Sequence, residues 1–430
     1  MEKEQKRLLV LGGGAAALDV VLEAKKLGYY VIATDYLQGG AAKEKADKSY
    51  QISTADIEEL KKLIEKEKID GVFCGPSEFN IINVMKLCKA SGLRFYASEE
   101  QWDTCANKSS YKQMCNTFKV PCAPEFDIAD RANIKYPVIV KPVDGNSSRG
   151  ITVCSKEDEL EDAYTRALKA SESKKALVEK FVESEGIGFN VRYIANKGEI
   201  YLVLTGDTYT VAEKEKEGLI NAVGIYPSKY TQYYIENIDE NVKRMFKAEK
   251  IENATFFMQA LVEDEIYFHE MGLRLSGGLL YKLVEPLTGV NDMKMMIRYA
   301  VEGEFATQEE IQKIDPYMGG KKACIFNIPL KVGTIAEIDG IQKIKDSIQL
   351  EALDTYYKIG DEIKPQYIGT IQQHFGRFKF IADSEEEIIE KIDFIQRNLD
   401  IKDMDGKDMI YKYFDTARIK KAGYLLNNKR

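Results

Sequence analysis

Histidine is nearly absent from this chain of 430 residues, which contains only His269 and His374. Two histidines nearly exclude a histidine-rich zinc site, and they argue against a Ser-His-Asp triad. Any chemistry must therefore depend on carboxylates, lysine, arginine, amides and a bound ion.

Cysteine is also sparse and shows no pattern. The seven cysteines are scattered, their number is odd, and no Cys-x-x-Cys pair occurs. This usage favours reduced thiols in a cytoplasmic protein over a disulfide framework.

Long apolar runs and basic clusters are missing as well. No run approaches the ~20 apolar residues that a membrane-spanning helix needs, and Leu8–Leu11 is too short for the core of a signal peptide. The net charge is −8, and no basic stripe stands out. We therefore expect neither a membrane span nor a nucleic-acid partner.

Strands and helices alternate from residue 7 to residue 98, which predicts a parallel, doubly wound sheet. The pattern predicts strands at 7–11, 30–34 and 70–74, and helices at 15–27, after a Thr54 cap and at 81–90. A chain of this length suits about two or three domains.

The first predicted strand ends in a glycine-rich turn that is compatible with a dinucleotide site. Gly12, Gly13 and Gly14 are followed by Ala17, and Asp35 lies near the place of a ribose-binding acid. A lone match of this kind is weak, and a structural tight turn explains it equally. An NAD(P)-dependent oxidoreductase therefore stays open as an alternative.

A second glycine-bounded loop follows a strand that carries one lysine. Lys141 stands in the apolar run 136–143, the polar loop 144–150 comes next, and a β-branched run follows at 151–153. The order predicts a hairpin whose loop amides and lysine bind a polyphosphate, against the alternative of an ordinary surface hairpin.

Capping signals and periodicity predict further elements along the chain. A helix is expected at 107–118. Capping boxes are expected at Ser155 with Asp158, at Thr307 with Glu310, and at Ser384 with Glu387. Strands are expected at 176–182, 189–211, 324–331, 366–371 and 375–381.

The segment 254–271 is a predicted hairpin that carries ligands for a hard cation. A two-residue turn at Asp264 and Glu265 places Gln259 directly opposite Glu270, with their Cβ atoms roughly 5 Å apart. An amide oxygen and a carboxylate at this spacing suit Mg²⁺. His269 alternates to the opposite face, and we interpret it as a packing residue.

Arg274 lies four residues beyond Glu270, just before Ser276-Gly277-Gly278. Its guanidinium is a candidate for stabilising an anionic intermediate, and a structural salt bridge is the alternative.

Taken in order, these features resemble the ATP-grasp superfamily, which includes biotin carboxylase, the large chain of carbamoyl-phosphate synthetase and purine-pathway ligases such as phosphoribosylglycinamide synthetase. The resemblance covers roughly residues 7–400. It implies a mixed α/β and α+β fold: a Rossmann-like N-terminal domain (1–105), an ATP-grasp domain (106–303) with a small lid at about 123–182, and a C-terminal α+β segment (304–430) that completes the ATP-grasp region.

The resemblance also implies roles for individual residues. Lys108 and Lys141 match the nucleotide lysines, and Gly145, Ser147, Ser148 and Gly150 belong to the loop over the phosphates. The run Glu179-Lys180-Phe181-Val182 matches the strand whose backbone binds adenine. Gln259 and Glu270 match the metal ligands, and Arg274 and Lys141 are the implied catalytic residues.

Two departures from the family pattern stand out. Gly272 replaces an asparagine that usually binds metal, so one or two Mg²⁺ ions remain possible by this reasoning. The usual ribose-binding glutamate falls near Gly188, and we expect Glu185, ahead of Glu183, to replace it.

The resemblance implies an ATP- and Mg²⁺-dependent ligase that joins a carboxylate to an amine, or to a thiol, through an acyl phosphate. Its expected partners are small carboxylate and amine substrates, and a homodimer is left open. A non-catalytic ATP-binding regulator, suggested by Gly272, is a further alternative.

Overall fold

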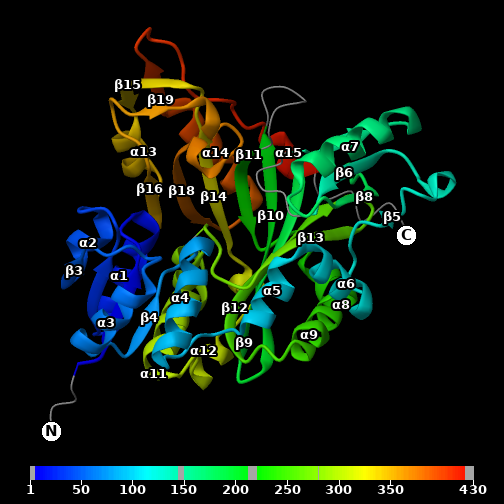
Figure 1. Cartoon of the computed structure of the whole chain (residues 1–430). Helices are drawn as coiled ribbons and strands as arrows, with labels where there is room; N and C mark the ends of the chain where they lie inside the picture. Colours follow the sequence, from blue (N-terminus) through cyan, green and yellow to red (C-terminus); the bar gives the residue numbers. More distant parts are fainter. Residues whose placement is uncertain (1–4, 144–149, 212–219, 279, 422–430) are drawn as a thin grey trace.

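The computed structural model describes residues 5–143, 150–211, 220–278 and 280–421. The strands form a parallel N-terminal sheet, a small lid sheet, a large antiparallel sheet and a small sheet near the C-terminal end (Figure 1). No helix among the described residues is long and apolar enough to cross a membrane.

The N-terminal domain has the predicted doubly wound topology. Its strands β1 (Arg7–Leu11), β2 (Tyr30–Thr34), β3 (Lys48–Tyr50) and β4 (Gly71–Phe73) are parallel in the order β3-β2-β1-β4. The helices are α1 (Ala15–Lys26), α2 (Ala41–Lys45), α3 (Ile57–Glu67) and α4 (Glu78–Ser91). One expected cap was wrong: Asp56, not Thr54, accepts the Glu59 N–H at the start of α3.

Two helices connect this domain to the lid. They are α5 (Glu99–Ala106) and α6 (Lys108–Phe118). Asn107 ends α5 and caps α6 by accepting N–H groups of Ser109 and Ser110, as the predicted helix at 107–118 requires.

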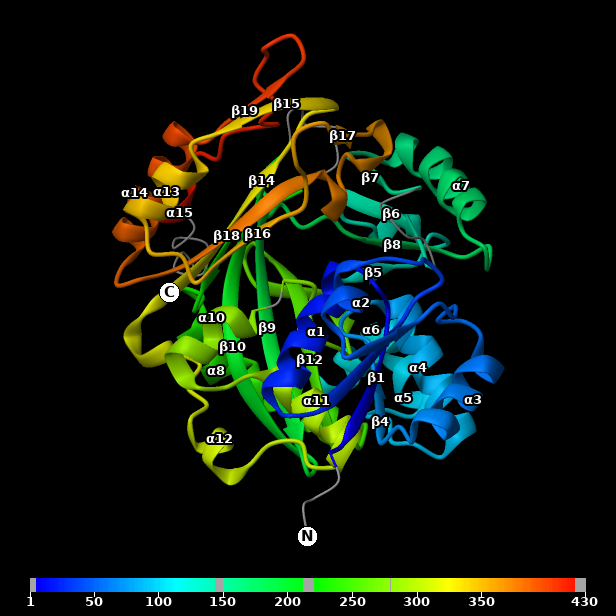
Figure 2. The same cartoon turned by 90° about the vertical axis from the view of Figure 1, so that its left-hand side faces the viewer.

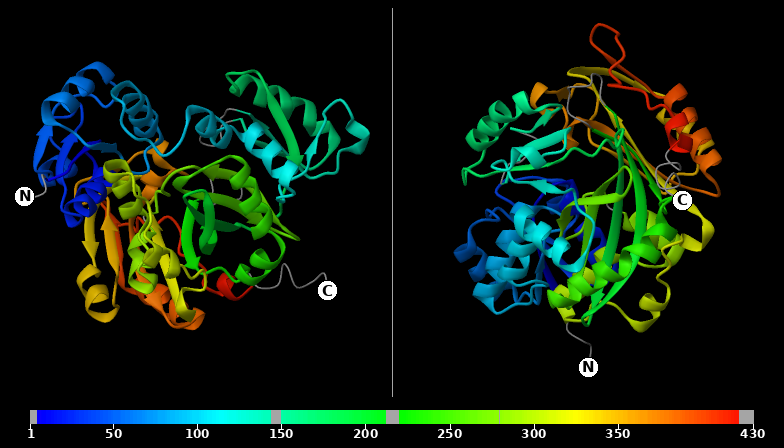
Figure 3. Two further views of the ribbon diagram at one scale, coloured as in Figure 1. Left: turned by 90° about the horizontal axis from the view of Figure 1, so that it is seen from below. Right: turned by 90° about the vertical axis from the view of Figure 1, so that its right-hand side faces the viewer.

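The lid is a four-stranded sheet that stands apart from the rest of the molecule (Figure 3). Its strands are β5 (Glu125–Phe126), β6 (Val138–Pro142), β7 (Thr152–Cys154) and β8 (Ala176–Lys180), in the order β5-β8-β6-β7. Strands β6 and β7 pair antiparallel, which confirms the predicted lysine hairpin.

One helix, α7 (Leu160–Ala170), covers the lid sheet. The capping box expected at Ser155 with Asp158 is wrong, because a 3₁₀ turn at Glu157–Glu159 delays the helix. Glu159 instead accepts the backbone N–H of Ser155.

The eight-stranded sheet is the largest sheet of the described residues and has the strand order β13-β12-β9-β10-β11-β14-β18-β16. Its strands are β9 (Ile187–Asn196), β10 (Glu199–Val211), β11 (Ile220–Tyr226), β12 (Asn253–Val262), β13 (Ile266–Gly272), β14 (Lys322–Pro329), β16 (Ala352–Thr355) and β18 (His374–Ala382). Since β14, β16 and β18 belong to the predicted C-terminal segment, that segment shares one sheet with the ATP-grasp segment. The domain boundaries near 105 and 303 stay predictions.

The remaining helices pack around this sheet or in the connections between its strands. They are α8 (Thr231–Asn237), α9 (Asp239–Ala248), α10 (Tyr281–Thr288), α11 (Asp292–Glu302), α12 (Gln308–Gln312), α13 (Ile341–Ser347), α14 (Glu385–Asn398) and α15 (Ala417–Lys421). Thr307 with Glu310 forms the predicted capping box of α12, and Ser384 caps α14 as predicted.

A three-stranded sheet at the C-terminal end was not predicted in this form. It consists of β17 (Glu362–Ile363), β15 (Gly333–Asp339) and β19 (Asp400–Asp403). The strand expected at 366–371 is wrong, because 3₁₀ turns at Pro365–Tyr367 and Ile371–Gln373 occupy that segment.

The N-terminal domain packs against helix α11 (Figure 2). Gly71 on β4 lies so close to this helix that a Cβ atom there would be 2.4 Å from the carbonyl oxygen of Ala300. A glycine is therefore required at this contact.

Candidate functional site

Two neighbouring cavities lie above the large sheet. The first, here the lid cavity, has a volume of about 640 Å³ and lies between the lid and the hairpin β12–β13. The second, here the sheet cavity, has a volume of about 750 Å³ and lies over strands β9 to β14 and β18. Both are bordered by Leu261, His269, Glu270 and Arg274.

A cluster of charges lines the lid cavity. The buried carboxylate of Glu179 on β8 binds the ammonium groups of Lys141 on β6 and Lys112 on α6, each at 2.5 Å. Burial raises the pKa of a carboxyl group, but the two lysines outweigh this effect, and the pKa of Glu179 is lowered. Both ammonium groups are thereby held in place, and Lys141 borders the lid cavity.

Gln259 and Glu270 lie opposite each other as predicted, although the hairpin turn differs from the one assumed. Gln259 on β12 pairs directly with Glu270 on β13. The hairpin loop contains Glu263, Asp264 and Glu265, and a β-bulge at His269 restores the pairing. The assumed two-residue turn was wrong, and the bulge compensates for the longer loop.

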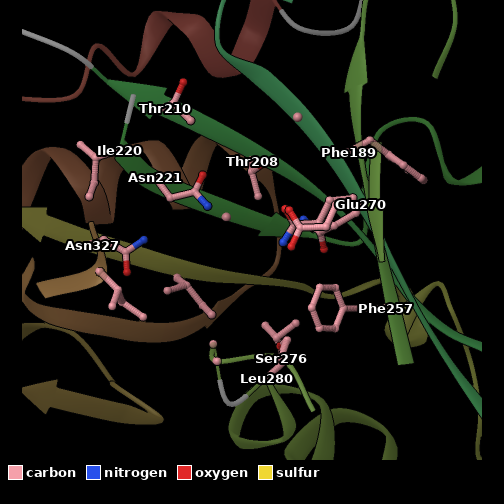
Figure 4. Close-up of a pocket in the computed structure, with 18 of the residues that line it drawn as sticks. Phe189, Thr208, Thr210, Ile220, Asn221, Phe257, Glu270, Ser276, Leu280 and Asn327 are labelled. Atoms are coloured by element: carbon pink, nitrogen blue, oxygen red, sulfur yellow. The ribbon is translucent and has the colours of Figure 1, made fainter. Parts of the chain in front are cut away.

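Glu270 lines both cavities, and Figure 4 shows its side chain among the residues of the sheet cavity. Burial raises the pKa of its carboxyl group, while the positive charges of Lys108 and Arg274 act in the opposite direction. The carboxylate of Glu270 and the adjacent amide oxygen of Gln259 form a partial set of ligands for a hard cation. The described residues contain no cluster of three or more histidine, cysteine or acidic ligands.

Arg274 is fixed by contacts on both sides. Its Nη2 atom lies 2.7 Å from the carboxylate of Glu78 on α4, and its guanidinium lies 5.0 Å from the ring centre of Phe257. Arg274 thus makes the structural salt bridge considered above and also borders both cavities.

The departure at Gly272 has a packing reason. Gly272 pairs with Phe257 across the hairpin, and a Cβ atom at Gly272 would lie 2.6 Å from the Phe257 ring. The aromatic ring fills the place that a side chain at this position would need.

The glycine-rich turn in the N-terminal domain is closed by its own acidic residue. The carboxylate of Asp35 accepts the backbone N–H of Gly13 at 2.9 Å and the N–H of Leu37. A carboxylate used in this way stabilises a tight turn, so the geometry favours the structural interpretation of this motif over a dinucleotide site.

Comparison with known proteins finds relatives among ligases and a formyltransferase. Residues 111–272 match the family model described as the D-ala D-ala ligase C-terminus. Formate-dependent phosphoribosylglycinamide formyltransferase of Bacillus subtilis is 26% identical over 296 residues, which is 63% of this chain and 71% of that protein. For the same enzyme of Sulfurisphaera tokodaii, the match is 25% over 213 residues, which is 46% of this chain and 53% of that protein. The chain spans about half the length of most of the curated relatives it matches.

Solved structures match over almost the whole chain. L-amino acid ligase from Bacillus licheniformis has a TM-score of 0.74 and 20% identity, covering 94% of this chain and all of that one. Phosphoribosylglycinamide synthetase from Anaerococcus prevotii has a TM-score of 0.73 and 22% identity, covering 93% of this chain and 100% of that one. Biotin carboxylase from Campylobacter jejuni has a TM-score of 0.71 and 20% identity, with 99% and 97% covered.

The chain therefore has the ATP-grasp fold, and its residues 111–272 are similar to a family of ATP-grasp ligases. The predicted fold class is confirmed, and ATP and Mg²⁺ are the cofactors of this superfamily. None of these findings supports the oxidoreductase alternative.

The structure brings most of the predicted ATP-grasp residues together. The lid cavity is lined by Lys108, Lys141, Glu179, Lys180, Val182, Glu270 and Arg274. Gln259 lines the adjacent sheet cavity. Gly145, Ser147 and Ser148 lie outside the described residues, and Gly150 packs close to Ala170 on α7.

Lys180 connects the lid with the hairpin. Its ammonium group binds Glu263 at 2.9 Å and Asp264 at 3.1 Å, and it lies 4.6 Å from the ring centre of Tyr267. The side chain therefore points to the hairpin loop, and the backbone N–H of Lys180 donates to the carbonyl oxygen of Pro124 at 2.8 Å.

Glu185, the expected ribose-binding residue, is not among the described residues that line either cavity. Its backbone carbonyl accepts a hydrogen bond from Arg418. The role of Glu185 stays a prediction without structural support.

His269 lies beside the lysine cluster. Burial and the charge of Lys141 lower the pKa of His269 to about 4, so the ring is neutral near pH 7. A neutral imidazole at a bulge agrees with a packing role, although His269 borders the same cavities as Glu270.

Sequence reasoning missed several residues of the site. Lys112 gave no signal, because its partner Glu179 is far along the chain. Arg192, Asn327 and Arg377 line the sheet cavity from strands without a recognisable motif. Two other cations have acidic partners: Lys282 pairs with Asp19 and Asp354, and Arg298 pairs with Glu310. Tyr226 on β11 also borders the sheet cavity.

Proposed function

We propose that the protein is an ATP- and Mg²⁺-dependent ligase that joins a carboxylate to an amine through an acyl phosphate. One observation carries this proposal: the lysine cluster and the Gln259–Glu270 pair border adjoining cavities that meet at Glu270 and Arg274. A nucleotide in the lid cavity thereby places its terminal phosphate next to a substrate in the sheet cavity. The ATP-grasp relatives support the same reaction type.

Residues of the lid cavity have distinct proposed roles. Lys108 and Lys141 neutralise phosphate oxygens, and the backbone of the run from Lys180 to Val182 binds the adenine edge. Gln259 and Glu270 fit Mg²⁺, because this ion needs few protein ligands when it also binds phosphates and water. When bound, Mg²⁺ supplies charge stabilisation to the transferring phosphoryl group.

In the first step, a carboxylate oxygen of the substrate attacks the γ-phosphorus of ATP, and ADP leaves. In the second step, the amine attacks the acyl carbon, and inorganic phosphate leaves. The guanidinium of Arg274 lies at the border between the cavities and stabilises the negative charge that develops in both steps.

The seven free cysteines support a cytoplasmic location, which we include in the proposal. We also propose a homodimer, by analogy with the 2-oxoglutarate carboxylase neighbour, whose biotin carboxylase domain is described as a dimer.

The test is ADP release, measured in a coupled assay with mixtures of carboxylic and amino acids. Glu270→Ala is expected to abolish ADP release and keep the unfolding curve, because it removes a metal ligand from an open cavity. The matched control is Glu304→Ala, an exposed glutamate outside both cavities, which is expected to keep full turnover.

Thermal unfolding separates the alternatives. ATP with Mg²⁺ should raise the melting temperature, and NAD(P) should not. Stabilisation by ATP without any ADP release would favour the non-catalytic regulator, and retained turnover in Glu270→Ala would overturn the metal assignment.

A further inference from the structure

Arg377 on β18 is a buried cation without a carboxylate partner among the described residues. Its side chain borders the sheet cavity, and the residue is only 6% exposed. Its Nη1 atom donates to the backbone carbonyl of Gly277 at 2.6 Å, and its guanidinium lies 5.6 Å from the ring centre of Tyr356. Neither contact neutralises the positive charge, and a buried unpaired charge is costly unless a ligand pairs with it.

The other two arginines that border this cavity are paired. Arg192 binds Asp292 at 2.8 Å, and Arg274 binds Glu78 at 2.7 Å. The sheet cavity, as far as its described lining extends, therefore has one uncompensated cation. One guanidinium balances the charge of a single carboxylate, whereas a phosphate monoester carries a charge of about −1.5 to −2 near neutral pH. The charge of the sheet cavity therefore suits a carboxylate better than a phosphate monoester.

Acceptors without donors lie next to Arg377. Asn327 on β14 pairs directly with Arg377 across the sheet, and its Oδ1 atom is buried without a hydrogen-bond partner. His374 is buried nearby, and its Nε2 atom donates to the carbonyl of Asn221, which leaves Nδ1 as an unpartnered acceptor. Buried acceptors of this kind are normally satisfied, so they indicate N–H or O–H groups on a ligand.

Asn327 lies on the side of the sheet cavity away from Glu270, with Asn221 between them (Figure 4). The reacting group of a substrate at Glu270 is therefore separated from a recognition group at Arg377.

We propose that the sheet cavity recognises the α-amino acid end of a substrate. Arg377 binds its carboxylate, and the acceptors of Asn327 and His374 receive hydrogen bonds from its ammonium group. This inference rests on the proposed function and narrows it: the substrate is an amino acid with a second reactive group, and it is not a phosphoribosyl compound like those named for the formyltransferase and synthetase relatives.

Equilibrium binding tests this inference without requiring turnover. The full chain is saturated with Mg²⁺ and ADP, and its melting temperature is measured with each of the L-amino acids and, separately, with glycinamide ribonucleotide. An amino acid should stabilise the wild type. Its apparent affinity should fall roughly 10–100-fold in Arg377→Met, the loss expected for a charged hydrogen bond, and recover in part in Arg377→Lys.

The effect of ADP on the melting temperature should stay unchanged in these variants, which shows that they are folded. Asn327→Leu serves as a second variant if Arg377→Met does not fold, and it should also weaken amino acid binding. Where an amino acid supports ADP release, Arg377→Met should raise its KM by a similar factor and leave the KM for ATP unchanged.

Stabilisation by glycinamide ribonucleotide alone, or by no amino acid, would overturn the inference. Amino acid binding with equal strength to the wild type and to both variants would overturn it as well. Binding that depends on Arg377 without any ADP release would instead support this recognition site and count against the ligase function.

Discussion

The carboxylate of Glu179 is shared by two lysines that come from separate parts of the chain. Lys112 arrives on α6, and Lys141 arrives on β6 of the lid. A single acid thus fixes both the charge and the position of the lysine that we assign to the phosphates. Without it, two ammonium groups would repel each other in a buried site.

We expect Glu179→Gln to lower the free energy of unfolding by about 3–5 kcal/mol, because it leaves buried lysines without a counter-charge. Urea unfolding measures the change. Glu125→Gln is the matched control: Glu125 lies 3.5 Å from Lys112 but is much more exposed, so a loss below about 1 kcal/mol is expected. Equal losses in both variants would contradict the central role of Glu179.

The effect of Glu179→Gln should depend on pH. The pKa of Glu179 is lowered in the folded protein. Its contribution to the free energy of unfolding is therefore fully present above the pKa of the unfolded state, about 4.3. It is lost as the pH falls through the folded value. The difference in the free energy of unfolding between the wild type and Glu179→Gln should therefore be largest near pH 7 and should decrease in acid.

Single residues with a motif were predictable, and residues without one were not. Lys141 precedes a glycine-bounded loop, and Gln259 and Glu270 stand on a clear hairpin, so local patterns identified them. Arg377 and Lys112 acquire their roles only from partners on distant strands and helices. No local pattern records such a partner.

The hairpin β12–β13 depends on its bulge. The loop from Glu263 to Glu265 shifts the register, and the extra residue at His269 restores the pairing of Gln259 with Glu270. A shift by one residue turns every later side chain to the other face of the sheet.

Insertion of one residue between His269 and Glu270 is therefore expected to abolish Mg²⁺-dependent ADP release, because Glu270 would then no longer oppose Gln259. His269→Ala keeps the bulge and should lose much less activity. The coupled assay over a range of Mg²⁺ concentrations compares the two variants. An unchanged Mg²⁺ dependence in the insertion variant would show that the pairing is not needed.

Several elements escaped prediction for local reasons. Helix α10 contains Pro286 and follows a glycine pair, and both features normally argue against a helix. The segment 366–371 has strand-forming residues, yet it forms 3₁₀ turns, in which Gln373 hydrogen-bonds to the backbone of Gly369 and Leu330. Tertiary contacts override propensity in both cases.

The N-terminal domain and the large sheet are joined at the contact of β4 with α11. Gly71→Ala should lower the free energy of unfolding by about 1–3 kcal/mol, because the new methyl group meets the Ala300 carbonyl. Gly39→Ala is the control, since a Cβ atom at Gly39 meets no neighbour within 4 Å. Urea unfolding of both variants gives the comparison, and equal stability would mean that the contact adapts freely.

The order of domains could be predicted because each has a distinct periodicity: alternating strands and helices first, then hairpins. How the domains join could not, because the joining contacts, such as Gly71 with α11, involve residues that are ordinary in their own segments. The three C-terminal strands that extend the large sheet could not be placed for the same reason, because they pair with strands that are distant in the sequence.

One hydrogen-bonded sheet runs without interruption from β13, which carries Glu270, to β18, which carries Arg377. Strand spacing in a sheet is nearly invariant, so the separation between these two side chains is set by the backbone and does not adjust to the ligand. Within a homologous series of acids, one chain length should therefore fit best, and compounds shorter or longer by a methylene should react more slowly.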